Sequence, residues 1–340
     1  MNIPTYWKSG LEDIDNIIKT VSKAKVTVSY SAGGRKIYLL EYGMPNKYNR
    51  LANYSSACGA RDNLASYADK SGEDIRPCVF LVGSVHGAEC EGVSAILNLI
   101  SLFETGKDLA GRENELLSNS INKVNYVIIP CVNPDGRMRF PRQSAVGMSL
   151  PDFRYYAQGT WKDKSLCNWP DCKKVHPILE YCDYLGAYYN DDGINLMHDN
   201  FNFPMAEETK LLLKAADKYV PDITVLFHGC ANARSEILIP NGVHPYFKDK
   251  AYEISEVLSL KCNSEQIPFT LSKPRYGYDE PIHNTNLVSV ITSVCGELCI
   301  TYESNQGLSE CENQLSYDMI DRQHTLFLET LHEFAVSGKL

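Results

Sequence analysis

Three short apolar runs constrain the fold of this chain more than any other feature of its sequence. Residues 78–83 (CVFLVG), 126–132 (YVIIPCV) and 223–227 (ITVLF) are almost entirely hydrophobic and have the length of strands. Continuous runs of this kind are typical of parallel strands buried on both faces by helices. Residues 92–103 (GVSAILNLISLF) lie between the first two runs and fit a helix that packs on the sheet. The order strand, helix, strand predicts a right-handed crossover.

The remaining periodic segments extend this α/β plan. Apolar residues at helical spacing predict a helix from Leu11 to Val21, and a turn at 31–34 predicts a hairpin of strands. Further helices are expected over 207–219 and 319–334, and residues 142–190 are expected to form loops over one face. We therefore predict one domain, residues 1–340, with a mixed, mostly parallel twisted sheet flanked by helices.

Composition excludes several classes of function. The 340 residues include 44% hydrophobic and 22% charged side chains, which suits a folded protein with a real core. A net charge of −9, without clustered lysine or arginine, argues against a nucleic-acid partner. No apolar run is long enough to span a membrane and no signal peptide is seen, so we expect a cytoplasmic protein. The 12 cysteines lie largely in apolar runs and are expected to be buried thiols.

Candidate metal ligands follow two of the apolar runs. His86 and Glu89 come directly after the first run, and His228 ends the third. Parallel strands bring such positions together at the carboxyl edge of a sheet. Zinc accepts imidazole nitrogen and carboxylate oxygen, and a catalytic site uses three protein ligands with one open position. The joint placement predicts one zinc ion held by these three side chains, although either motif alone also fits a structural role.

The sequence resembles the zinc carboxypeptidase family of the carboxypeptidase A type. Residues 133–136 (NPDG) follow the second apolar run, as the N-P-D-G motif of that family does. Residues 31–42 (SAGGRKIYLLEY) are similar to its early strand pair, and residues 300–303 (ITYE) to the late strand that ends in the catalytic glutamate. Together with the His86 motif, these segments occur in the family's order. The resemblance implies a zinc hydrolase with Glu303 as general base, with Glu297 as the alternative on the same run.

The resemblance also implies groups that contact the substrate. An arginine that polarises the scissile carbonyl is expected, and Arg142 is the first candidate, with Arg139 and Arg137 behind it. Arg139 is a further candidate for substrate binding. A tyrosine that closes over the substrate is expected at Tyr278, with Tyr276 as the alternative.

One segment departs from the family pattern. Residues 193–201 (GINLMHDNF) match the segment that supplies an Asn-Arg clamp for a substrate's terminal carboxylate, but Met197 and His198 stand at those two places. Methionine donates no hydrogen bond, and histidine lacks the guanidinium fork, which leaves His198 or another arginine as the anchor. Three functions remain open: a peptidase acting on peptide substrates, a deacylase of N-acyl amino acids resembling succinylglutamate desuccinylase and aspartoacylase, and a non-catalytic zinc-binding relative.

Overall fold

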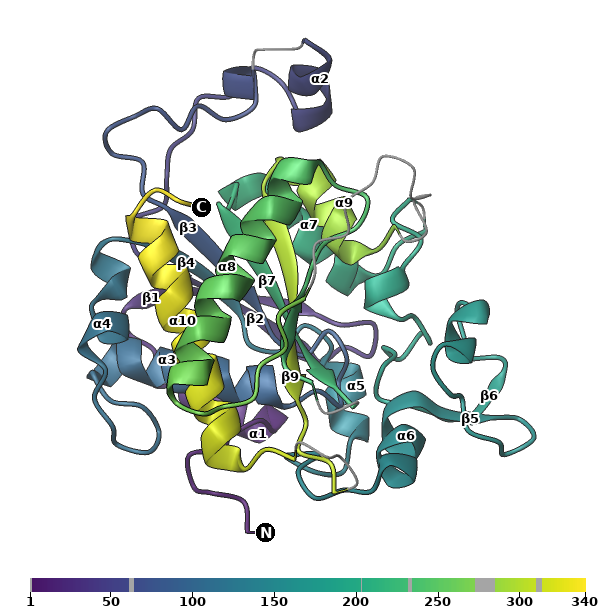
Figure 1. The fold of residues 1–340 in the computed structure, drawn as a ribbon. Helices are drawn as coiled ribbons and strands as arrows, with labels where there is room; N and C mark the ends of the chain where they lie inside the picture. Colours follow the sequence, from purple (N-terminus) through teal and green to yellow (C-terminus); the bar gives the residue numbers. More distant parts are fainter. Residues whose placement is uncertain (1, 61–63, 203, 232–233, 273–284, 310–313) are drawn as a thin grey trace.

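The computed structural model describes residues 2–60, 64–202, 204–231, 234–272, 285–309 and 314–340. Within these residues the centre of the molecule is a seven-stranded sheet (Figure 1). In spatial order its strands are β1 (Ala24–Tyr30), β2 (Lys36–Tyr42), β4 (Asn125–Ile129), β3 (Cys78–Val82), β7 (Ile223–Cys230), β9 (Leu298–Asn305) and β8 (Glu236–Leu238). Strands β4, β3, β7 and β9 run parallel, and antiparallel strands flank them on both sides. The mixed, mostly parallel sheet that the sequence predicts is confirmed.

Helices cover both faces of this sheet (Figure 1). One face packs against α1 (Leu11–Ile18), α3 (Glu91–Thr105), α4 (Glu115–Ser118), α8 (Pro245–Ser264) and α10 (Tyr317–Val336). The other face packs against α7 (Glu207–Tyr219) and α9 (Leu287–Cys295). The expected helices over 11–21, 92–103, 207–219 and 319–334 are therefore present, with ends that differ by a few residues.

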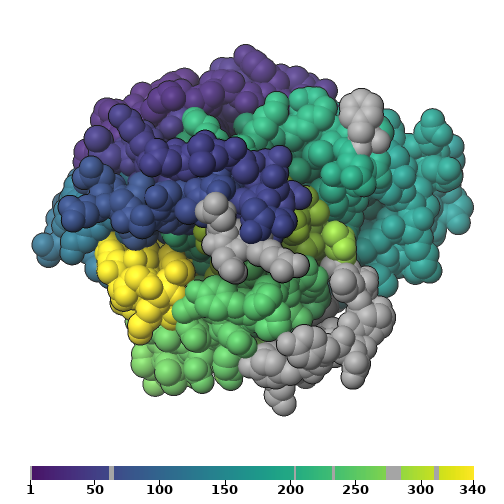
Figure 2. All heavy atoms as spheres, turned by 90° about the horizontal axis from the view of Figure 1, so that it is seen from above, coloured from purple at the N-terminus to yellow at the C-terminus, as the bar shows by residue number. Residues whose placement is uncertain are grey.

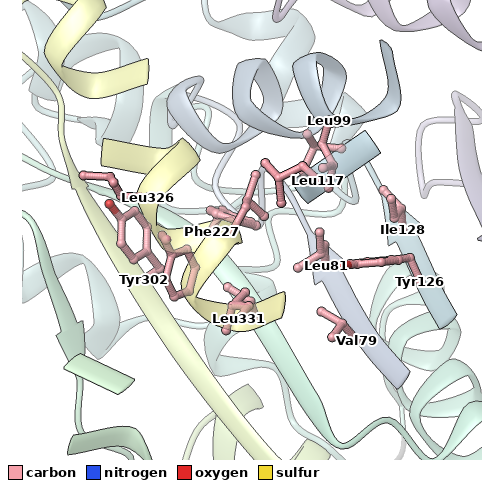
Figure 3. Close-up of a cluster of buried hydrophobic side chains, with 14 of the residues drawn as sticks. Val79, Leu81, Leu99, Leu117, Tyr126, Ile128, Phe227, Tyr302, Leu326 and Leu331 are labelled. Atoms are coloured by element: carbon pink, nitrogen blue, oxygen red, sulfur yellow. The ribbon is translucent and has the colours of Figure 1, made fainter. Parts of the chain in front are cut away.

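Strand β3 shows why the apolar runs have no polar alternation. Val79 and Leu81 point into the core under α3 and α10, whereas Phe80 and Val82 point into the core under α7 and α9. Figure 3 shows the first of these cores, where Val79 and Leu81 lie in one cluster with Phe227 of β7. Full burial of each such side chain stabilises the fold by roughly 1.5–3 kcal/mol. A polar residue at any of these positions would lose that contribution.

Residues 142–190 differ from the expected loops. They contain α6 (Leu150–Gln158), a small hairpin of β5 (Gly159–Trp161) and β6 (Cys182–Leu185), and the short helix η3 (Asp171–Lys174). Ser149 caps α6 by accepting a hydrogen bond from the Asp152 backbone, and Phe153 and Ala157 bury one face of it. This segment forms a projection at one side of the molecule in both views (Figures 1 and 2).

The remaining short elements join these parts. They are α2 (Tyr54–Gly59), α5 (Pro134–Arg139), η1 (Leu64–Ser66), η2 (Ser120–Asn122) and η4 (Leu196–His198). Every cysteine in the described part of the chain is a free thiol, and most are buried, as expected. Among the described residues, no helix is both long and apolar enough to cross a membrane.

Helix α3 packs closely on the sheet at Gly92. A Cβ at this position would lie 2.2 Å from the Cβ of Phe227, which β7 holds in place. Helix propensity favours alanine over glycine by at most about 1 kcal/mol, whereas overpacking a core costs roughly 1–3 kcal/mol. We expect Gly92→Ala to lower the free energy of unfolding, measured by urea denaturation.

Gly59 provides a matched control for that substitution. It ends α2, and a Cβ there would meet no atom of the described residues within 4 Å. We expect Gly59→Ala to change the free energy of unfolding by no more than about 1 kcal/mol. Equal stability of the two variants would show that α3 and β7 can separate without cost.

Candidate metal centre

Three side chains from two neighbouring strand ends meet at the carboxyl edge of the sheet. His86 and Glu89 lie between β3 and α3, and His228 lies near the end of β7. Their ligand atoms all lie within 4.8 Å of one another, and all three residues are buried. Glu89 Oε1 is 2.9 Å from His86 Nδ1, and Glu89 Oε2 is 2.9 Å from His228 Nδ1. The sequence prediction that these residues converge agrees with this geometry.

The backbone between β3 and α3 turns sharply to place His86. Ser84 adopts a φ of 55°, a left-handed conformation that costs a non-glycine residue roughly 1–3 kcal/mol. Gly87 lies against the start of α5, where a Cβ would approach the carbonyl carbon of Gly136 to 2.0 Å. Only glycine at position 87 allows this approach, so the loop that carries His86 and Glu89 is packed directly on the segment that begins α5.

The N-P-D-G segment holds the surrounding loops together. Asn133 caps α5 and donates its amide to the carbonyl of Val85, 3.2 Å away. Asp135 accepts from Ser31 Oγ at 2.5 Å and from the backbone N–H of Gly33 at 2.8 Å. Burial alone would raise the pKa of Asp135, but these hydrogen bonds lower it below its usual value. The motif therefore orders the β1–β2 turn and the His86 loop, and it does not reach the triad.

The hydrogen bonding around His86 indicates which nitrogen is free for a metal. Asn195 Oδ1 accepts the backbone N–H of Met197 and lies 3.1 Å from His86 Nε2. Because an amide oxygen only accepts, we assign the proton of His86 to Nε2, which leaves a lone pair on Nδ1. That lone pair faces Glu89 Oε1.

A cation between Glu89 and the two histidines would stabilise this arrangement. Burial alone would raise the pKa of Glu89, but His86 and His228 outweigh burial and hold the pKa below its usual range. An ionised carboxylate oxygen and an imidazole lone pair repel each other at 2.9 Å unless a proton or a metal ion lies between them. Two imidazole nitrogens and one carboxylate are a ligand set that zinc prefers. The triad is compatible with zinc.

Glu303 lies beside the triad. Strands β7 and β9 pair in parallel with His228 opposite Glu303, so both side chains project from the same face of the sheet. Both line a cavity of about 170 Å³, which His86 also lines. Burial raises the pKa of Glu303 to about 7, and a divalent cation in the triad would act in the opposite direction. Glu297 lies at the other end of β9, where Lys70 Nζ binds it at 2.7 Å.

The structure does not bring the predicted arginines to this cavity. Arg142 is exposed, and its carbonyl accepts a hydrogen bond from the buried side chain of Arg137. Arg139 is held by Asp191 and by the carbonyl of Tyr189. None of the three is among the described residues that line the cavity, so their roles in polarising or binding a substrate remain predictions without support from this geometry.

The predicted substrate residues have different outcomes. Tyr278 and Tyr276 lie outside the described residues. His198 lines the cavity, and burial together with Lys173 and other neighbours lowers its pKa to about 3. This shift disfavours the charged form of His198 at neutral pH, and its role in binding a substrate stays a prediction.

Several residues of the site carried no recognisable signal in the sequence. The ring of Tyr188 stacks on His86 with ring centroids 4.1 Å apart and an interplanar angle of 6°. Lys173 and Trp169 line the cavity from the segment between β5 and β6, where the sequence shows little periodicity. Asn195 is different, because it lies in residues 193–201, which resemble a family segment, and that place in the pattern could have indicated a role in orienting a ligand.

The sequence of this chain matches a known protein family. The profile described as zinc carboxypeptidase matches residues 13–182. The chain belongs to the zinc carboxypeptidase family. No curated protein matches this family member closely enough to be compared with it.

Solved carboxypeptidases share the fold of this zinc carboxypeptidase family member at low identity. A metallo-carboxypeptidase from Pseudomonas aeruginosa, in complex with (2-guanidinoethylmercapto)succinic acid, matches with a TM-score of 0.57 and 14% identity, over 95% of this chain and 68% of its own. A metallo-carboxypeptidase from Burkholderia cenocepacia gives 0.60 and 13%, over 96% and 70%. Carboxypeptidase A from Helicoverpa armigera gives 0.52 and 14%, over 98% and 75%. At these identities the likeness shows the fold.

Asn195 is expected to raise the affinity of the metal centre for zinc by orienting His86. Residues that orient a metal-binding histidine typically contribute about 10- to 100-fold to metal affinity. We expect Asn195→Ala to weaken zinc binding by that factor, measured by competition with a chelator.

Two further variants distinguish orientation of His86 from general damage. Asn195→Asp keeps an acceptor for the His86 N–H and is expected to retain zinc at least as tightly as the parent. Asn200→Ala changes an exposed residue of the same segment and should have no effect on affinity. Parental zinc affinity in Asn195→Ala would remove the assigned role.

Proposed function

We propose that this chain is a zinc-dependent metallopeptidase that hydrolyses peptide amide bonds with Glu303 as general base. The observation that carries this proposal is the pairing of His228 with Glu303 on adjacent strands, with both side chains lining the cavity that His86 also lines. A structural metal site would need neither an adjacent unpaired carboxylate nor a cavity. Membership of the zinc carboxypeptidase family supports the same class of reaction.

Different residues of the cavity would bind the metal ion and transfer the proton during amide hydrolysis. Zinc at the triad would supply Lewis acidity, which polarises a carbonyl and lowers the pKa of water. His86, Glu89 and His228 would hold the ion, with Asn195 fixing the orientation of His86. Glu303 would accept a proton from the attacking water and deliver it to the nitrogen of the leaving amine.

A second candidate function is deacylation of N-acyl amino acids. Met197 forms part of the cavity wall at the place where the family resemblance implies an amide donor, so the usual clamp for a terminal carboxylate is incomplete. The two candidates share the triad and Glu303, and they differ in the substrate that is cleaved.

A paired measurement tests the proposal. The zinc content of protein purified without an affinity tag is measured first, and the zinc-loaded protein is then incubated with a peptide library and with a panel of N-acyl amino acids. Cleavage of peptides supports the peptidase, and cleavage restricted to acyl amino acids supports the second candidate. Full zinc loading without hydrolysis of either panel would favour a non-catalytic zinc-binding protein.

Substitution of Glu303 separates the proposed base from the metal centre. Glu303→Gln keeps the size of the side chain but cannot accept the proton, and general bases typically contribute about 10²- to 10⁴-fold to rate. We expect kcat to fall by that factor while the zinc content stays at one ion per chain, measured by steady-state kinetics and by metal analysis.

Glu236→Gln is the matched control for this substitution. Glu236 lies opposite Glu303 on β8, accepts a hydrogen bond from Ser272 Oγ at 2.8 Å, and is not among the described residues that line the cavity. It is expected to retain a kcat within a few-fold of the parent. Near-parental turnover by Glu303→Gln would exclude Glu303 as the base.

A further inference from the structure

Lys173 is a cation in the wall of the catalytic cavity. It lies at the end of η3, in the segment between β5 and β6, and it is half-buried. Among the described lining residues it is the one lysine or arginine. Its Nζ atom lies 3.4 Å from the centroid of the Trp169 ring. No carboxylate in the described part of the chain forms an ion pair with it, whereas its neighbour Lys174 binds Asp171 at 2.6 Å.

Few contacts within the described part of the protein replace the water that the ammonium group of Lys173 loses on burial. Lys173 is half-buried, and because its charged form loses part of its contact with water, burial lowers its pKa to about 8. The face of Trp169 offers a partial replacement through a cation–π contact. His198 also lines the cavity, and burial together with Lys173 lowers its pKa, so it offers Lys173 no negative charge.

The other charges of the cavity do not compensate Lys173 either. A divalent ion at the triad would balance the carboxylates of Glu89 and Glu303. Among the described residues, Lys173 would then remain as the positive charge without a partner. A cavity with this balance favours a ligand that carries one negative charge.

We propose that Lys173 anchors a carboxylate of the substrate in the cavity where the amide bond is cleaved. This inference rests on the proposed function and names the substrate class: peptides or acyl amino acids with a carboxylate close to the scissile bond. The cavity of about 170 Å³ is smaller than the roughly 300–1,000 Å³ of sites for drug-sized ligands, so it suits a single terminal residue. Lys173 thereby supplies, from a different segment, the charge that Met197 and His198 do not provide.

Matched substrates test which carboxylate is recognised. One pair of peptides differs only in a free C-terminal acid or a C-terminal amide, and a second pair, amidated at the C-terminus, differs only in glutamate or glutamine at the last residue. An ion-paired hydrogen bond typically contributes enough to change kcat/KM by about 10- to 100-fold. The zinc-loaded parent is expected to prefer the carboxylate member of one pair by that factor, and that pair identifies the source of the carboxylate.

Three variants separate this role from a structural one. We expect Lys173→Met to lower kcat/KM for the preferred carboxylate substrate by about 10- to 100-fold and to leave its neutral partner unchanged. Lys173→Arg should recover most of the preference, because it keeps the charge. Lys174→Met removes the exposed neighbouring lysine and should behave as the parent. An equal loss on both members of the pair would overturn the proposal, because it would indicate a role in folding or at the reacting carbonyl.

Binding to the zinc-loaded Glu303→Gln variant gives a readout that does not depend on turnover. Isothermal titration compares the same acid and amide peptides, with and without Lys173→Met in that background. A preference for the carboxylate that disappears with Lys173→Met supports the anchor even if the parent hydrolyses neither panel, in which case the proposed function alone fails. Equal affinity for the two peptides before the substitution would overturn the anchor while leaving hydrolysis intact.

Discussion

The register between parallel strands β3, β7 and β9 is the constraint on which the rest of the structure depends. It pairs Val82 with Leu226 and His228 with Glu303, so two reactive side chains lie side by side where the strands end. A slip of one residue would turn each strand's apolar side chains toward the wrong core. Because these strands are buried on both faces, such a slip is opposed by the packing of the whole sheet. The geometry of the site is therefore a consequence of hydrophobic burial far from it.

The metal centre adds a demand that packing alone does not satisfy. Glu89 is buried between two imidazole rings. Its ionised form is stabilised there by positive charge close to the carboxylate, carried by the imidazole rings or by a bound cation. Binding of a cation to such ligands is coupled to folding, since the three residues come together only in the native chain. The strained backbone at Ser84 and the close packing at Gly87 are local costs that the surrounding loops have to offset.

The sequence was informative where a physical period or a strand end carried the signal. The buried strands, the helices that cover them and the triad His86, Glu89 and His228 follow from apolar runs and from the polar residues that end them. The contribution of residues 142–190 could not be read in this way. Tyr188 reaches the site from irregular backbone and Lys173 from the short helix η3, and the course of this segment depends on long-range contacts such as the burial of α6. Arg142 was chosen by its offset from the N-P-D-G motif, and an offset does not tell which way a loop side chain points.

The division between these two kinds of residue has a functional meaning. The residues proposed for bond cleavage are fixed by strand register, whereas the residues that contact the remainder of a substrate lie on connecting segments that tolerate change. Loss of the amide and guanidinium donors at positions 197 and 198 would leave a family fold with chemistry but no anchor for an anion. The proposed anchor Lys173 would meet the same electrostatic requirement without disturbing the sheet, because it reaches the cavity from a segment outside the strands. With these proposed roles, substrate choice would be separable from bond cleavage, since each would depend on a different part of the fold.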